Sequence, residues 1–236
     1  TLKAVIHCQG STSFMMALCA GLLPEVSSVV ANAVALHPVV PHLARAKSAI
    51  ATDLVGLCTD YLNPQWGLYR SGIVPTLINW WVRATHHECD NPVCKHSSFV
   101  YGTGSPTLWR HENLNERTHE WIKGEFAAVP LSFFRQMADC IAEGHLRSTG
   151  VYEQLPRNFV AQAPKTSARI LFLCGERNAC FVSEGMARTY DFFEQHAPGR
   201  HDFQQVAGYG HLDIFIGQNA AQEVLPLIVD ELGKTR

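Results

Sequence analysis

The chain has 236 residues, 47% of them hydrophobic and 17% charged, and its formal net charge is −2. These values are typical of a folded domain with a substantial core and exclude a disordered chain. The sequence has no run of Lys and Arg with interleaved aromatic residues, so it does not predict nucleic-acid binding. No stretch approaches the roughly 18 apolar residues of a membrane span, and the N-terminus lacks the layout of a signal peptide, so we expect a cytoplasmic protein.

The first elements predict a strand, a helix and a second strand. Leu2 to Ile6 is a short apolar run that stops at His7-Cys8-Gln9-Gly10, as a buried strand does before a turn. Ser11 to Leu22 is rich in Met, Ala, Leu and Phe and predicts a buried helix. Val26 to Leu36 is mostly apolar with many β-branched residues, and predicts the second strand.

The C-terminal part repeats this alternation. Strands are predicted at Arg169 to Cys174 and at Asp202 to Val206, with helices over about Ser183 to His196 and about Ala220 to Leu232. Alternating strands and helices predict a parallel sheet flanked by helices, which is the α/β class.

Residues 38–165 differ from both ends, because they are rich in Trp, His, Asn and Pro. Helical patches begin at Pro75 and Pro130, where the first turn of a helix tolerates proline. We therefore predict a core formed by residues 1–37 and 166–236, and a mostly helical cap, called the insert below, formed by residues 38–165. The polar stretch His111 to Trp121 is interpreted as a helix that holds the insert to the core, in preference to one that lines a substrate entrance.

The turn after the first strand has the pattern of a nucleophile elbow. A strand that ends in His-Cys-Gln-Gly and runs straight into a helix would place Cys8 on a sharp, strained turn. The backbone N–H of Gln9 would then face an oxyanion, and the helix N-terminus would favour the Cys8 thiolate. The motif departs from G-x-S-x-G because Ile6 stands at the first glycine and Cys replaces Ser. The alternative is a buried, inert cysteine.

The predicted base lies in the last turn. Gly208-Tyr209-Gly210-His211 follows the last strand, and the glycines allow a tight loop that presents His211. A nucleophile early in the chain and a histidine late is the order of α/β-hydrolases. The alternative is an ordinary loop histidine packed under the final helix.

The third member of the site should follow the strand that ends at Cys174. Asn178 stands where an acid is usual, and its amide oxygen could accept a hydrogen bond from the imidazole, as in Cys-His-Asn enzymes. Glu176 is the competing choice and Asp213 a distant third.

Cys89 and Cys94 stand five positions apart, with histidines nearby. Their spacing lies at the wide end for a structural zinc site, and no second Cys pair is near. We expect no metal site and interpret the segment as a closed hairpin loop with two adjacent thiols, with zinc or a strained disulfide as the alternatives.

Five strings together resemble one known family: His7-Cys8-Gln9-Gly10-Ser11-Thr12, Cys89-Asp90-Asn91-Pro92-Val93-Cys94, His111-Glu112-Asn113-Leu114-Asn115, Gly175-Glu176-Arg177-Asn178 and Gly208-Tyr209-Gly210-His211. They resemble the α/β-hydrolase domain that is fused to GMC-type (cholesterol oxidase-like) flavin oxidoreductases in bacteria. The resemblance implies an α/β-hydrolase fold whose N-terminal strands are missing from this chain, either because it is a fragment or because another chain supplies them. No G-x-G-x-x-G follows a strand, so we expect no flavin and no other cofactor.

Two functions remain open on the sequence alone. The first is a hydrolase of the esterase or lipase type that uses Cys8 on an ester, thioester or lactone of a small apolar, sterol-like or lipid-like molecule. The second is a non-catalytic, hydrolase-like binding domain whose partner is a fused GMC oxidoreductase or a missing N-terminal hydrolase segment. A third interpretation is that a chain of this kind is classified by the oxidoreductase to which it is fused, and not by an activity of its own.

Overall fold

The centre of the molecule is a four-stranded parallel sheet. The computed structural model describes residues 2–33, 36–45, 47, 55–102 and 107–234. The strands follow one another in space as they do along the chain, in the order β1-β2-β5-β6. They are β1 (Leu2–His7), β2 (Val26–Asn32), β5 (Arg169–Gly175) and β6 (Asp202–Val206). The sequence therefore predicted all four strands and their parallel direction. β2 ends before the predicted Leu36, and residues 34 and 35 of that prediction lie outside the described residues.

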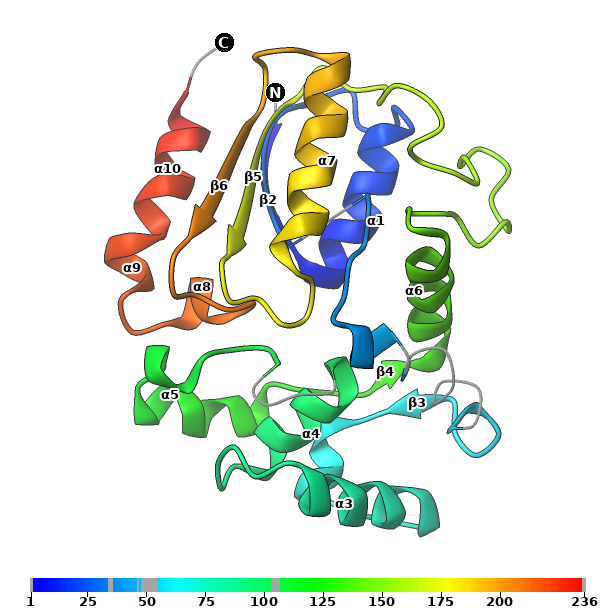
Figure 1. The fold of residues 1–236 in the computed structure, drawn as a ribbon, viewed down its shortest axis with the longest axis vertical. Coiled ribbons are helices and arrows are strands. Elements are labelled where there is room, and N and C mark those ends of the chain that lie inside the picture. The colour runs from blue at the N-terminus through cyan, green and yellow to red at the C-terminus, as the bar shows by residue number, and fades with distance from the viewer. Residues whose placement is uncertain (1, 34–35, 46, 48–54, 103–106, 235–236) are drawn as a thin grey trace.

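Helices cover both faces of this sheet (Figure 1). α1 (Cys8–Cys19) and α7 (Ser183–His196) pack on one face, and α9 (Ala220–Glu223) and α10 (Leu225–Gly233) pack on the other. The single helix predicted for this segment is therefore two helices, separated at Val224. The reason is Pro226 at the start of α10, which has no N–H to continue the hydrogen bonds of the preceding helix.

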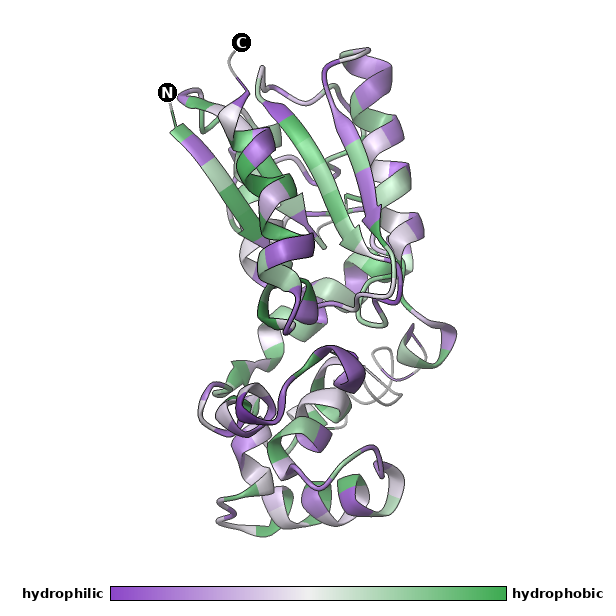
Figure 2. Ribbon diagram, turned by 90° about the vertical axis from the view of Figure 1, so that its left-hand side faces the viewer, coloured by the Kyte–Doolittle hydropathy of each residue, from purple (hydrophilic) through white to green (hydrophobic). Residues whose placement is uncertain are grey.

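The middle strands explain why this part of the chain folds. Every residue of β2 is buried, and all but the first residue of β5 are buried. Figure 2 shows this as hydrophobic strand centres between helices whose outer faces are hydrophilic. A strand buried on both faces needs apolar residues without alternation, which is the pattern of Arg169 to Cys174. The two hydrophobic clusters on either side of the sheet make up the main core.

Most of the insert lies beyond the carboxyl ends of the strands, and its last segment returns beside α1 to the start of β5 (Figure 1). It also contains a short antiparallel ribbon, which the sequence did not predict. Its described helices and strands, with η for 3-10 helices, are β3 (Tyr61–Leu62), η1 (Pro64–Gly67), α3 (Ile73–Thr85), α4 (Pro92–Tyr101), η2 (His111–Asn113), α5 (Glu116–Trp121), η3 (Ile122–Gly124), β4 (Val129–Pro130) and α6 (Leu131–Glu143). A further short helix, α8 (Asp213–Ile216), follows β6 in the core. No helix among the described residues is both long and apolar enough to span a bilayer.

Two details of the insert differ from the sequence prediction. The stretch His111 to Trp121 is not one helix: η2 and α5 are separate, because the side chain of Asn115 caps α5 by accepting the N–H of Thr118 at 2.8 Å. The predicted hairpin at Cys89 to Cys94 is instead a loop followed by the first turn of α4.

The role predicted for this polar stretch, holding the insert to the core, is confirmed. The side-chain amide of Asn113 donates to the backbone oxygen of Gly208 at 3.0 Å and to the carboxylate of Asp213 at 2.6 Å. In the other direction, the N–H of Gln218 donates to the backbone oxygen of Asn113 at 2.7 Å. The insert is therefore fixed directly to the loop that follows β6.

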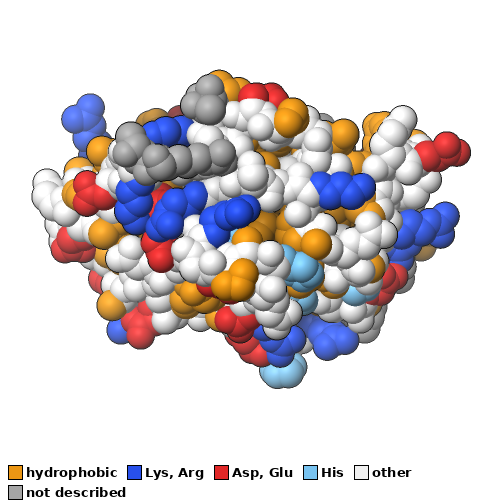
Figure 3. Space-filling view, turned by 90° about the horizontal axis from the view of Figure 1, so that it is seen from above, with side chains coloured by type: hydrophobic (Ala, Val, Ile, Leu, Met, Phe, Trp, Pro, Cys, Tyr) orange, Lys and Arg blue, Asp and Glu red, His pale blue; other side chains and the backbone are white. Residues whose placement is uncertain are grey.

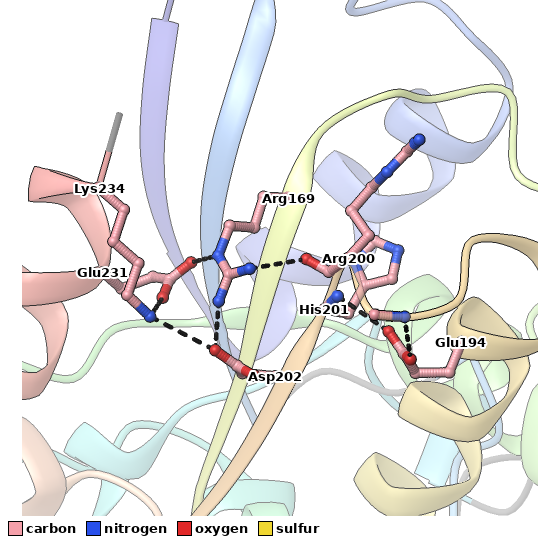
Figure 4. Close-up of polar contacts among 8 residues, drawn as sticks. Arg169, Glu194, Arg200, His201, Asp202, Glu231 and Lys234 are labelled. Carbon is pink, nitrogen blue, oxygen red and sulfur yellow. Dashed lines mark hydrogen bonds and ion pairs between the residues drawn. The ribbon is translucent and has the colours of Figure 1, made fainter. Parts of the chain in front are cut away.

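A charged network fastens β5, β6 and α10 at the opposite end of the sheet (Figure 4). Arg169 binds the carboxylate of Glu231 at 2.6 Å and that of Asp202, and Lys234 binds Glu231 at 2.7 Å. Seen from this end, the surface carries cationic and anionic side chains side by side (Figure 3). The Glu231 side chain is only 2% exposed, whereas that of Asp202 is 50% exposed, so Glu231 depends far more on its partners.

We expect Glu231→Gln to lower the free energy of unfolding by about 2 kcal/mol, because it removes two charge-assisted hydrogen bonds from a buried carboxylate whose partners are partly in water. Asp202→Asn is the matched control and should lower it by less than about 1 kcal/mol. Urea denaturation of both variants measures the difference. Equal losses would contradict the central role of Glu231.

Candidate active site

The backbone at Cys8 has the conformation of a strained turn. Cys8 joins the last residue of β1 to α1 and has a φ of +52°, in the left-handed region that costs a residue with a side chain about 1–2 kcal/mol. Hydrogen bonds hold the turn, since the hydroxyl of Ser11 donates to the backbone oxygen of Cys8 and that of Thr12 does so at 3.5 Å. The sharp strand-to-helix turn predicted from the sequence is therefore present.

The residues that flank this turn explain its departure from the usual motif. Ile6 packs into the main core, with 8% of its surface exposed, so a glycine is not needed for space there. A Cβ atom on Gly10 would meet nothing within 4 Å. Gln9 lies in the first turn of α1, where backbone N–H groups have no partner within the helix.

His211 reaches the turn from the loop after β6. One ring nitrogen of His211, one of His7 and the sulfur of Cys8 all lie within 4.8 Å of one another. The His211 side chain is buried, with 1% exposed. The two predicted partners, which are 203 positions apart by their numbers 8 and 211, are therefore neighbours in space.

A close backbone contact positions the His211 loop. A Cβ atom on Gly175, at the end of β5, would lie 2.1 Å from the backbone oxygen of Gly210, so only glycine fits there. The N–H of Gly210 donates to both carboxylate oxygens of Asp213, at 3.1 and 2.9 Å. Asp213 thus serves to shape the loop, with Asn113 as its other partner.

Of the predicted third members, Asn178 forms a hydrogen bond with His211, and it does so through its side-chain nitrogen. Its side-chain oxygen accepts the N–H groups of Cys180 at 2.9 Å and Phe181 at 3.1 Å. The amide nitrogen must then face Nδ1 of His211, which lies 3.0 Å away. The sequence predicted the reverse, with the oxygen accepting from the ring. As the amide is placed, Nδ1 accepts and the ring proton resides on Nε2, which is buried with no partner among the described residues.

Glu176, the competing third member, lies elsewhere. Its side chain is exposed, and one carboxylate oxygen accepts the N–H of Gly208 at 3.0 Å. It therefore supports the His211 loop from outside and does not take the place of Asn178.

His7 is a site residue that the sequence analysis did not single out. Its ring lies 4.6 Å from that of His211, centroid to centroid, and its Nδ1 lies 2.7 Å from the side-chain oxygen of Asn32. His7 and Asn32 are paired across β1 and β2, so each ends its strand at the same edge of the sheet. The sequence signal that could have identified His7 is its position directly before Cys8, at the carboxyl end of a predicted parallel strand.

Burial keeps the central pair uncharged at neutral pH. It raises the pKa of the Cys8 thiol to about 11, and a hydrogen bond from the backbone of Gln9 opposes this only in part. Burial, helped by the positive potential of His7, also lowers the pKa of His211. The sequence suggested a thiolate favoured by the helix terminus. The structure instead favours a neutral thiol beside a neutral imidazole.

Cys8 opens into an apolar pocket between the core and the insert. The pocket has about 900 Å³ of empty space, part of it open to solvent. Apart from Cys8, Lys47 and Tyr101, nearly all of its wall is hydrocarbon, mostly from the insert; lining side chains include Phe99, Leu131, Phe134, Met137, Ile141 and Phe181. Lys47 donates to the backbone oxygen of Gly102 at 2.7 Å, so this lysine is bound to backbone.

We expect iodoacetamide to label Cys8 slowly at pH 7, with a rate that rises about tenfold per pH unit until pH approaches 11. The sign follows from the raised pKa, since the thiolate is the reactive form and is scarce below that pKa. Mass spectrometry of peptides after timed labelling measures the rate, with exposed Cys58 as the internal control. A rate already constant at neutral pH would contradict the neutral thiol.

Comparison with solved structures finds proteins of the same fold. A monoacylglycerol lipase from Paleococcus ferrophilus superposes with a TM-score of 0.53 at 12% identity, over 98% of this chain and 67% of the lipase. A candidate non-heme bromoperoxidase from Mycobacterium tuberculosis H37Rv also gives 0.53, at 14% identity, over 99% of this chain and 68% of the other. No protein-family model matches the sequence, and a search of curated proteins finds no match. The chain has the α/β-hydrolase fold.

Proposed function

We propose that the chain is a hydrolase of the esterase or lipase type in which Cys8 is the nucleophile and His211 the general base. One observation carries the proposal: the sulfur on the strained turn lies within 4.8 Å of a ring nitrogen of His211, at the carboxyl end of a parallel sheet. A nucleophile held on such a turn beside a buried base is the arrangement that acyl transfer requires.

The proposed substrate is an ester, thioester or lactone of an apolar molecule. The support is the pocket at Cys8, whose wall offers hydrocarbon and few polar groups to an acyl chain or ring system. A monoacylglycerol lipase is among the proteins of similar fold, and the motifs of the insert resemble domains fused to sterol-type oxidoreductases. All three favour a lipid-like or sterol-like acyl compound.

In the proposed first step, the sulfur of Cys8 attacks the carbonyl carbon while its proton passes to Nε2 of His211. The electron pair of the carbonyl moves onto oxygen, which the N–H of Gln9 stabilises. Collapse of this intermediate expels the alcohol or thiol, which takes the proton from His211. Water, deprotonated by the same imidazole, then releases the acid from the thioester and restores the Cys8 thiol.

This step requires a change at Asn178. Nε2 can accept a proton only when the ring proton resides on Nδ1, and the amide of Asn178 then has to turn so that its oxygen accepts from Nδ1. This rotation of the amide breaks the hydrogen bonds from the N–H groups of Cys180 and Phe181, each worth about 1 kcal/mol. We therefore propose a slow hydrolase whose rate is limited by the tautomer of His211.

The rival function is a binding domain without catalysis, whose partner is a GMC oxidoreductase or another hydrolase segment. The orientation of the Asn178 amide is the observation on that side. The two functions differ in one measurable species, because only the enzyme forms an acyl thioester on Cys8.

We expect the chain to hydrolyse medium-chain aryl esters and thioesters, and to accumulate an acyl adduct on Cys8 that is visible by intact-protein mass spectrometry. Cys8→Ala should abolish both the adduct and turnover, and His211→Ala should lower kcat by at least about a hundredfold. Glu184→Gln, an exposed residue on α7 that pairs with Arg188, is the control and should retain activity. Binding of the ester with no adduct and no turnover would contradict the hydrolase and favour a binding domain without catalysis.

We expect Asn178→Asp to increase kcat/KM by at least about tenfold. One carboxylate oxygen can still accept from Cys180 and Phe181 while the other accepts from Nδ1, which fixes the productive tautomer without any turn. The negative charge should also raise the pKa of His211, so the acidic limb of the rate profile should move to higher pH. A folded variant with unchanged or lower activity would contradict His211 as the base.

A further inference from the structure

A second cluster of reactive side chains lies in the insert. Cys89 precedes α4, Cys94 lies in its first turn, His111 is in η2 and His119 is on α5. One candidate ligand atom from each residue lies within 4.8 Å of every other, and the sulfur of Cys94 is 3.3 Å from Nε2 of His111. Two segments of the insert, residues 89–94 and 111–119, thus bring two thiols and two imidazoles to one point.

The spacing of these atoms fits one tetrahedral metal ion. Zinc binds sulfur at about 2.3 Å and imidazole nitrogen at about 2.0–2.1 Å, so neighbouring ligand atoms around it lie roughly 3.3–3.8 Å apart. A group already confined within 4.8 Å needs only small side-chain movements to reach that geometry. Two thiolates with two imidazoles select zinc over magnesium or calcium, which prefer oxygen ligands.

The cluster has valences that the described protein leaves unused. Nε2 of His119 is buried and has no hydrogen-bond partner among the described residues, a costly state for an imidazole nitrogen. Cys89 and Cys94 are both free thiols, so they do not satisfy each other through a disulfide. A divalent cation would supply the missing partner, and two thiolates would balance its charge in this half-buried place.

The surroundings hold the four side chains in place. The side-chain oxygen of Asn91 caps α4 by accepting the N–H groups of Val93 at 3.0 Å and Cys94 at 3.1 Å. The amide nitrogen of Asn91 donates to the backbone oxygen of His119 at 2.6 Å. The rings of His111 and His119 meet edge to face, 4.8 Å between centroids. Such outer contacts orient ligands before a metal binds.

We propose that Cys89, Cys94, His111 and His119 form a closed structural zinc site that fixes the insert against the His211 loop. Zinc binding releases the two thiol protons and leaves no coordination position for a substrate. The link to the loop is short. η2 carries both His111 and Asn113, and Asn113 binds Gly208 and Asp213 beside His211. The N–H of Leu212 also donates to Leu108 in the insert at 2.7 Å.

The first test is metal content. The full protein, purified without chelator and dialysed against zinc and then buffer, should retain about one zinc per chain by plasma mass spectrometry. Cys94→Ser and His119→Asn should each lose it. Cys58→Ser and His196→Asn replace an exposed cysteine and an exposed histidine elsewhere and should retain it.

The His7, Cys8 and His211 group could also hold a metal, so a further variant separates the two places. Cys8→Ser should keep its zinc. Zinc lost from Cys8→Ser but kept by Cys94→Ser would overturn the proposal. So would a wild-type protein without zinc, or a Cys89–Cys94 disulfide found in peptides from protein purified under air.

If the cluster variants do not fold, the visible spectrum of bound cobalt tests the site in a protein whose cluster is unchanged. Cobalt added to the metal-free Cys8→Ser protein should give the intense visible bands of tetrahedral, thiolate-bound Co²⁺, and zinc should bleach them. A weak, octahedral-type spectrum would overturn the site. Chelation should also lower Tm by several degrees in wild type and Cys58→Ser alike. None of these readouts requires that Cys8 be catalytic.

Discussion

The site depends on one backbone constraint, the left-handed conformation of Cys8 between β1 and α1. A residue with a side chain enters this region at a cost, and the cost is met by hydrogen bonds from Ser11 and Thr12 and by the packing of α1 on the sheet. Because the turn is sharp, the thiol projects from the carboxyl edge of the sheet. His211, which follows β6, meets it at that same edge, and Asn178, which follows β5, contacts His211 there.

The glycine at the end of β5 makes this meeting possible. With no side chain at Gly175, the backbone of the His211 loop passes directly over the end of the strand. The insert completes the arrangement through Asn113, which reaches the loop from a segment about 100 residues earlier in the chain. The core and the insert are thus joined at the same loop that carries His211, so the stability of the insert and the position of His211 are coupled.

Much of this could be predicted from sequence because the signals are local. Short segments that end at turn signals predicted the four strands, with glycines after β1, β5 and β6 but not after β2, and α7 matches its predicted range. The prediction failed where a property depends on backbone geometry or packing that residue types alone do not specify. The direction of the Asn178 amide depends on the backbone of Cys180 and Phe181, and the raised pKa of Cys8 depends on how the insert covers it. His111 and His119 are 17 and 25 positions beyond Cys94, by their numbers, and only folding brings them to it.

The raised pKa of the half-buried Cys8 thiol has a consequence under oxidising conditions. Peroxides attack thiolates far faster than thiols, so a sulfur that holds its proton is a poor target for conversion to sulfenic or sulfinic acid. Hydrocarbon walls that slow the chemistry of Cys8 also shield it from this damage. The burial that keeps the Cys8 thiol protonated therefore also slows its oxidation.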